Sequence, residues 1–267
     1  TGDYYFLETL QYQATLCYLF TISSRGSGVE RVIKPVQTRG LAWATRTYGQ
    51  LAGIAPIGPL TEDVIAMLNY SASHWRSLIE TPGTSQIGYF YNYNSYSDSV
   101  QSVAPWMEHF WMQANGYVSD LEYSADMSDF NFVRDHMYKG VVGILGGNGP
   151  GQYCYTKAGA YNVTVADTET YDPVDWFASW GDVWTATYGE SNDNCGAVLT
   201  GGYINGASVR KAYWGNLLPA LSYAIDDHAV GATAGLNRLM AADNWSDISE
   251  ADWADLPNWG IVPRGMN

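Results

Sequence analysis

Residues 36–54 read VQTRGLAWATRTYGQLAGI, and their polar and apolar side chains alternate with the period of an α-helix. The apolar face of this helix comprises Leu41, Ala44, Tyr48, Leu51 and Ala55. The opposite face comprises Arg39, Trp43, Arg46 and Gln50. A helix with these two faces separates a core from a polar but sheltered space. The alternative is a surface helix whose polar side faces solvent.

A second helix with the same division is predicted from about Trp106 to Leu121, with Pro105 at its start. One face comprises Trp106, His109, Gln113 and Tyr117, and the other comprises Met107, Trp111, Ala114 and Val118. Tryptophan on the polar face of both helices favours a lined groove over a solvent-facing surface.

Helical spacing covers most of the remaining chain and predicts further helices over about residues 4–22, 128–145, 208–227 and 229–243. Thr61 is expected to cap a helix that ends at Pro82, and Asp172-Pro173 to begin one that reaches about Tyr188. Strand alternation is confined to residues 161–165. The sequence therefore predicts an all-α fold of about nine helices in antiparallel hairpins, as a single domain over residues 1–267.

Long connecting segments precede every second predicted helix, at residues 26–35, 84–104 and 189–207. In a stack of hairpins, these segments and the amino ends of the helices that follow them lie on one face. Helix amino ends carry partial positive charge, so this face is expected to favour a carboxylate or a sulfate group.

Three short sequences resemble bacterial (α/α)-toroid proteins: QTRGLAWATR at 37–46, APWM at 104–107 and WGIVPR at 259–264. That group includes heparinase-like and alginate-lyase-like polysaccharide lyases and uncharacterised exported or phage-borne relatives. The similar helical layout covers most of the chain. It implies an (α/α) toroid with long loops on one face. The predicted helices are too few for a closed ring, so an incomplete toroid, the C-terminal part of a longer protein, is expected.

The resemblance also implies β-elimination on a uronic acid, in which Asn, Gln or Arg holds the carboxylate while His and Tyr transfer protons. The catalytic candidates are Arg39, Tyr93 and His109. The substrate-binding candidates are Gln37, Trp43, Arg46, Tyr89, Tyr91, Asn92 and Trp106. A tyrosine acts as the base only if a nearby cation lowers its pKa from about 10, and Arg39 or Arg46 is expected to supply that charge.

The loop GYFYNYNSY at residues 88–96 alternates aromatic rings with amides, which suits stacking on sugars and bonding to their hydroxyls. Two other interpretations stay open for this loop. It packs on the next helix, or it forms a protein–protein contact.

Composition excludes several functions. The chain has 13 Lys+Arg against 27 Asp+Glu, a net charge of −14, which argues against binding to nucleic acid. It contains no apolar run long enough for a membrane span, and no motif for a metal or another cofactor. Cys154 and Cys195 either pair or remain free thiols. Low lysine content and acidity favour an extracellular, periplasmic, virion or cell-surface location.

The sequence thus predicts a carbohydrate-active, lyase-like protein that binds or cleaves an acidic polysaccharide. One alternative is a non-catalytic structural or adhesion component of a virion, filament or cell surface, with protein partners or self-assembly through aromatic patches. The other is a glycoside hydrolase, which needs two carboxylates. Its candidates are Glu30, Asp98 and Glu108, although Glu108 is expected to be an exposed helix residue.

Overall fold

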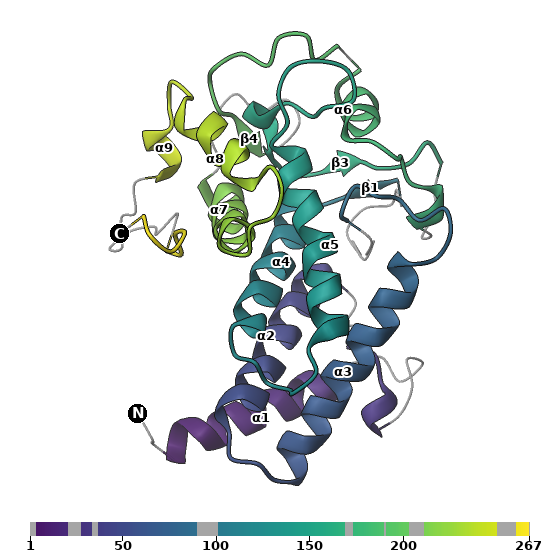
Figure 1. The fold of residues 1–267 in the computed structure, drawn as a ribbon, viewed down its shortest axis with the longest axis vertical. Coiled ribbons are helices and arrows are strands. Elements are labelled where there is room, and N and C mark those ends of the chain that lie inside the picture. Colours follow the sequence, from purple (N-terminus) through teal and green to yellow (C-terminus); the bar gives the residue numbers. More distant parts are fainter. Residues whose placement is uncertain are drawn as a thin grey trace.

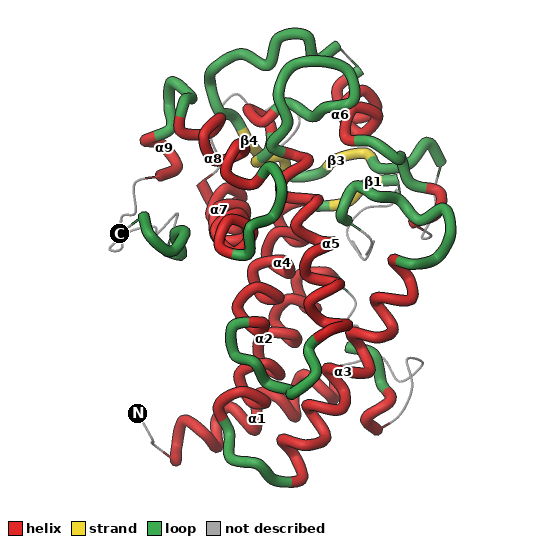
Figure 2. Tube along the Cα trace, in the orientation of Figure 1, coloured by secondary structure: helices red, strands yellow, loops and turns green. Residues whose placement is uncertain are grey.

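The computed structural model describes residues 4–20, 28–33, 37–89, 101–168, 173–189, 191–202, 211–249 and 260–266. This part of the chain is mainly helical, which confirms the all-α prediction (Figures 1 and 2). Its α-helices are α1 (Tyr4–Phe20), α2 (Thr38–Ile54), α3 (Pro59–Ile79), α4 (Pro105–Ser119), α5 (Ser128–Ile144), α6 (Trp180–Tyr188), α7 (Lys211–Asp226), α8 (Ala232–Met240) and α9 (Ser246–Ser249).

The described strands are two residues long and join the loops above the helices. Strand β1 (Ser102–Val103) pairs antiparallel with β3 (Val163–Thr164), and β2 (Gly159–Ala160) pairs parallel with β4 (Gly201–Gly202). The strand expected over residues 161–165 is therefore present in part, as β3.

The long helices of the centre pack in two layers. One layer contains α2 and α4, with α7 packed on α4, and the other contains α3 and α5, which pack on each other. The α2–α3 and α4–α5 hairpins turn at the same end of the molecule (Figure 1). Consequently α2 and α4 run in the same direction, and their amino ends lie together at the opposite end.

The apolar faces predicted for α2 and α4 form the core between these layers. Leu41, Tyr48 and Leu51 of α2 and Trp111 and Val118 of α4 have no exposed surface. The rings of Trp75 and Trp111 meet edge to face with their centroids 5.2 Å apart.

Two predicted helix starts are wrong. Helix α3 begins at Pro59, two residues before Thr61, because proline suits the first turn. The Thr61 hydroxyl donates to the carbonyl of Pro56 at 2.9 Å instead of capping the helix. The helix expected from Asp172-Pro173 begins only at Trp180. The Ser179 side chain accepts a hydrogen bond from the Asp182 backbone N–H and caps it there.

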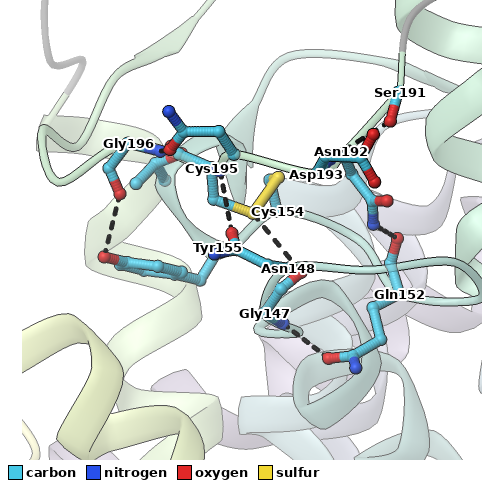
Figure 3. Close-up of a disulfide and its surroundings, with 12 residues drawn as sticks. Gly147, Asn148, Gln152, Cys154, Tyr155, Ser191, Asn192, Asp193, Cys195 and Gly196 are labelled. Carbon is cyan, nitrogen blue, oxygen red and sulfur yellow. Dashed lines mark hydrogen bonds between the residues drawn. A yellow bond between two sulfur atoms is a disulfide. The ribbon is translucent and has the colours of Figure 1, made fainter.

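A disulfide joins Cys154 and Cys195, which decides between the two states left open by the sequence (Figure 3). It connects the loop after α5 to the loop before α7, across 41 residues. Polar contacts hold the same two loops: the Cys195 N–H donates to Asn148 Oδ1 at 2.8 Å, and Asn192 Nδ2 donates to the Gln152 carbonyl at 2.6 Å. These bonds fix the loops over the end of α5.

Candidate functional site

Three ring contacts connect α2 to α4 along one side of the two helices. Each pairs one α2 side chain with one α4 side chain: Arg39 with Trp106, Trp43 with Phe110, and Arg46 with Tyr117. The guanidinium carbons of the first and third pairs lie 5.9 and 5.6 Å from the ring centroids. The rings of the middle pair meet edge to face, with centroids 5.0 Å apart. We call these six residues the ladder.

The ladder is a surface, not a part of the core. Arg39 is exposed and Trp43 is 53% exposed, while Arg46, Trp106 and Tyr117 are half-buried. Long side chains held against rings in this way lose less conformational entropy when they bind a ligand. Arg39, Trp43 and Arg46 of one predicted polar face therefore lie beside Trp106 and Tyr117 of the other. The prediction that His109 shares the face of Trp106 is wrong, because His109 is buried beside Tyr89.

The arginines of the ladder carry charge that no described acid neutralises. The described polar bond of Arg39 is to Gln37 Oε1 at 3.4 Å, and neither Arg39 nor Arg46 forms an ion pair with a described residue. Arg76, in contrast, pairs with Glu80 and Asp129. In a chain with a net charge of −14, two such arginines on one face form a local site for an anion.

Two further tyrosines extend the ladder at the amino end of α4. The Trp106 ring lies 6.4 Å from the ring of Tyr161, after β2, and 5.9 Å from that of Tyr213, in the first turn of α7. Sequence reasoning missed both residues. Helical spacing relates positions within one helix, whereas these side chains arrive from separate elements.

A second set of polar groups lies on the other side of α4, inside the protein. The Tyr89 Oη and His109 Nε2 atoms are 2.7 Å apart, and both side chains are at most 1% exposed. Next to His109, Glu108 is 1% exposed and is hydrogen-bonded to Thr38. Its Oε2 atom has no hydrogen-bond partner among the described residues. We call Tyr89, Glu108 and His109 the buried cluster.

Burial keeps the buried cluster uncharged at neutral pH. Desolvation raises the pKa of Glu108 to about 8, against an opposing hydrogen bond from Thr38, and lowers the pKa of His109 to about 3. Burial also raises the pKa of Tyr89, and the nearby carboxyl of Glu108 adds to this. The expected lowering of a tyrosine pKa by an arginine does not occur at Tyr89. The prediction of an exposed Glu108 is wrong.

Close backbone packing holds Tyr89 in place. Gly88 has φ +85°, and a Cβ added to it would lie 2.1 Å from the backbone nitrogen of Gly140. A Cβ on Gly140 would in turn lie 2.5 Å from the Tyr89 ring. The ring also meets Trp180 edge to face at 5.1 Å, and Trp180 Nε1 donates to the Ile87 carbonyl at 3.0 Å.

The structure thus divides the candidates into two groups. Gln37, Arg39, Trp43, Arg46 and Trp106 gather at the ladder, whereas Tyr89 and His109 meet in the buried cluster. Tyr91, Asn92 and Tyr93 lie outside the described residues, as does Asp98. Of the other two hydrolase carboxylates, Glu30 is exposed and Glu108 is buried.

No family model, curated protein or solved structure matches this chain. Within the described ranges, no group of three His, Cys, Asp or Glu residues is arranged to hold a metal ion. None of the described helices combines the length and the apolar character that crossing a bilayer requires.

Proposed function

We propose that this protein is a carbohydrate-active extracellular protein that binds an acidic glycan along the ladder. The observation that carries this proposal is the pair of arginines, Arg39 and Arg46, that lie on one face without a described acidic partner. They are separated by seven positions on α2, or roughly 10 Å at the rise of an α-helix. Two anionic groups of one glycan chain fit such a spacing.

The chemistry of Trp43 and of two glutamines near the ladder supports the same ligand. Trp43, exposed between the two arginines, offers an apolar ring on which a sugar stacks. Gln37 and Gln113 add amide groups that bond to hydroxyls. An exposed aromatic ring flanked by two cations suits an acidic sugar polymer better than a purely apolar ligand.

Two observations bear on the fold and the location within this proposal. The packing of α2 on α4 and of α3 on α5 supports the proposal of an incomplete (α/α) toroid, in which α2 and α4 would form the inner layer. The Cys154–Cys195 disulfide is typical of oxidising compartments and favours secretion or surface display.

Cleavage by β-elimination is the further step of the proposal. Burial lowers the pKa of His109 to about 3, which makes it a weak base in the closed protein. His109 would meet a sugar and accept a proton only if the cover over it moves. Binding along the ladder does not depend on this step, so binding and cleavage are tested separately.

The test is a panel of uronate polymers and neutral polysaccharides. Titration calorimetry measures binding, and absorbance of the unsaturated product measures elimination. Binding of acidic polymers above neutral ones supports the proposal, and absorbance that His109→Ala abolishes extends it to a lyase. A folded protein that binds no acidic polymer would refute it.

A structural or adhesion role is the second candidate, and helix α1 favours it. This helix exposes more than half of each of several large apolar side chains: Tyr4, Tyr5, Phe6, Tyr12, Leu16 and Leu19. Exposed apolar patches of this kind mark sites of association. Light scattering that shows large assemblies, without glycan binding, would favour this candidate.

A further inference from the structure

We propose that the C-terminal segment, residues 260–266, closes the ladder at its Arg46–Tyr117 end and restricts binding to one terminus of a glycan chain. This inference rests on the proposed function and specifies which part of the ligand the ladder accepts. It makes Ile261 and Arg264 determinants of specificity.

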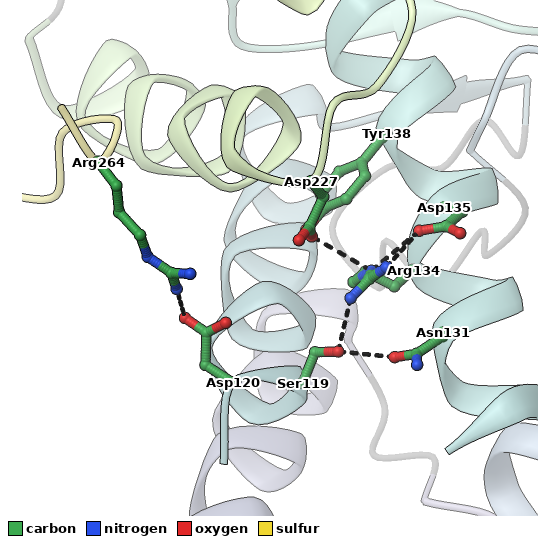
Figure 4. Close-up of polar contacts among 8 residues, drawn as sticks. All are labelled: Ser119, Asp120, Asn131, Arg134, Asp135, Tyr138, Asp227 and Arg264. Carbon is green, nitrogen blue, oxygen red and sulfur yellow. Dashed lines mark hydrogen bonds and ion pairs between the residues drawn. The ribbon is translucent and has the colours of Figure 1, made fainter. Parts of the chain in front are cut away.

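The C-terminal segment is attached to the carboxyl ends of two helices. The Ser222 hydroxyl of α7 donates to the Ile261 carbonyl at 3.0 Å, and the Arg264 N–H donates to Asp226 Oδ1 at 2.7 Å. The Arg264 guanidinium also pairs with Asp226, at 3.6 Å, and with Asp120 at the end of α4 (Figure 4). The segment thereby bridges α7 and α4 beside the last pair of the ladder.

Asp226 and Asp227, which are adjacent in the chain, have separate structural partners. Asp227 accepts a hydrogen bond from Tyr138 at 2.8 Å and lies 3.4 Å from Arg134 of α5 (Figure 4). Because α5 secures this carboxylate from the other side, the turn after α7 is a firm support for the C-terminal segment.

Little space is left where the segment meets the ladder. The cavity there has a volume of about 30 Å³ and is lined by Arg46, Phe110, Gln113, Ala114, Tyr117 and Ile261. Such a volume suits about one water molecule, so Ile261 packs closely against this end of the ladder. Arg39, at the other end of the ladder, and Trp43, in its middle, are exposed.

The asymmetry of the ladder predicts how a glycan lies on it. The last sugar stops at Ile261, with an anionic group near Arg46, and the chain leaves past Trp43 and Arg39. An internal stretch of polymer cannot occupy the ladder, since it would have to continue through Ile261. Each polymer molecule then binds a single protein, whatever its length.

The test is the number of proteins bound per glycan chain, measured by titration calorimetry with acidic oligosaccharides and polymers of defined length. We expect one wild-type protein molecule to bind per glycan chain, whatever the length of the glycan. Arg264→Ala releases the C-terminal segment, so the number of protein molecules bound per long polymer should at least double. Ile261→Ala removes the side chain that covers the Arg46–Tyr117 end while keeping the ion pairs of Arg264. It should also raise the number of protein molecules bound per long polymer. Arg76→Ala, which removes a distant ion-paired arginine, is the control.

The outcomes separate this inference from the proposed function. The closure would be overturned if several wild-type protein molecules bound along one polymer, or if the variants still bound as one protein molecule per glycan chain. Either result would leave glycan binding intact. A wild type that binds no acidic glycan would overturn both. If Arg264→Ala fails to fold, Ile261→Ala decides alone.

Discussion

Helix α4 contributes to the ladder on one side and to the buried cluster on the other. Ionisable side chains are charged and at least partly exposed at the ladder but uncharged in the buried cluster. At the ladder, Arg39 and Arg46 stay in contact with water and form no ion pair within the part of the chain that the structure describes. In the buried cluster, desolvation leaves Glu108 protonated and His109 neutral. If the ladder binds a glycan as proposed, we expect its affinity to depend on the exposed residues. The buried ones are expected to affect stability and its dependence on pH.

The largest effect expected is on the packing of the buried cluster. Gly88→Ala should lower the free energy of unfolding by about 4 kcal/mol, because it combines a positive φ with a collision against Gly140. Urea unfolding measures the change. The matched control is Gly83→Ala, since Gly83 has φ +88° but its added Cβ would lie 3.3 Å from a Val174 methyl. Equal losses at the two glycines would show that the collision does not matter.

The next effect is a change in how stability depends on pH. Glu108 has a pKa of about 8 in the folded protein and an ordinary value of 4.5, so the unfolded chain ionises first as pH rises. The contribution of protonated Glu108 is complete below pH 4.5 and is lost between 4.5 and 8, by about 1.4 kcal/mol per pH unit at most.

His109 acts in the opposite sense and only below pH 6.5, because its folded pKa is about 3. The window from pH 6.5 to 8 therefore isolates Glu108 from His109. Across this window Glu108→Gln should flatten the decline in thermal stability that the wild type shows, whereas Glu62→Gln, at an exposed position of α3, should not. A decline that persists unchanged in Glu108→Gln would mean that the carboxyl is ionised inside the protein.

A smaller effect is expected from the hydrogen bond within the buried cluster. Tyr89→Phe removes the hydroxyl 2.7 Å from His109 Nε2 and leaves the imidazole without that partner. The free energy of unfolding should fall by about 1–3 kcal/mol, as for other buried polar groups that lose a partner. Binding of an acidic glycan should not change. A weaker glycan affinity in this variant would connect the buried cluster to the ladder.

The smallest change in stability is expected at Trp43. This side chain is 53% exposed, so Trp43→Ala should alter unfolding by less than about 1 kcal/mol. Glycan affinity should fall about tenfold, which corresponds to the loss of a stacked ring. Ile57→Ala removes a more exposed apolar side chain away from the ladder and should leave affinity unchanged. Equal glycan affinity of Trp43→Ala and Ile57→Ala would show that Trp43 does not contact the glycan.

Helical spacing predicted much of the fold because a repeated apolar face has few ways to be buried. The helices expected over 36–54, 106–121 and 128–145 end within about two residues of α2, α4 and α5. The starts of α3 and α6 depended on local competition, between Pro59 and Thr61 and between Pro173 and Ser179. Single-residue preferences do not decide such cases.

The candidate site was predictable where it belongs to two amphipathic helices and not where it depends on a third partner. Arg39, Trp43, Arg46 and Trp106 followed from spacing alone. The burial of Glu108 did not, because α4 is packed against α2, α5 and α7 and little of its circumference remains exposed. Met112 and Asn115, which share the side of Glu108, are also fully buried. Because two of these three side chains are polar, helical spacing did not mark this side as buried.

The central claim is that Arg39 and Arg46 of the ladder, which have no acidic partner among the described residues, bind an acidic glycan. The most direct measurement is the affinity of Arg39→Gln/Arg46→Gln for the acidic polymer that the wild type binds best, with urea unfolding of both proteins. We predict a loss of at least about a hundredfold, as expected for two charge-assisted contacts, with unchanged stability. Full affinity in the folded double variant would contradict the account.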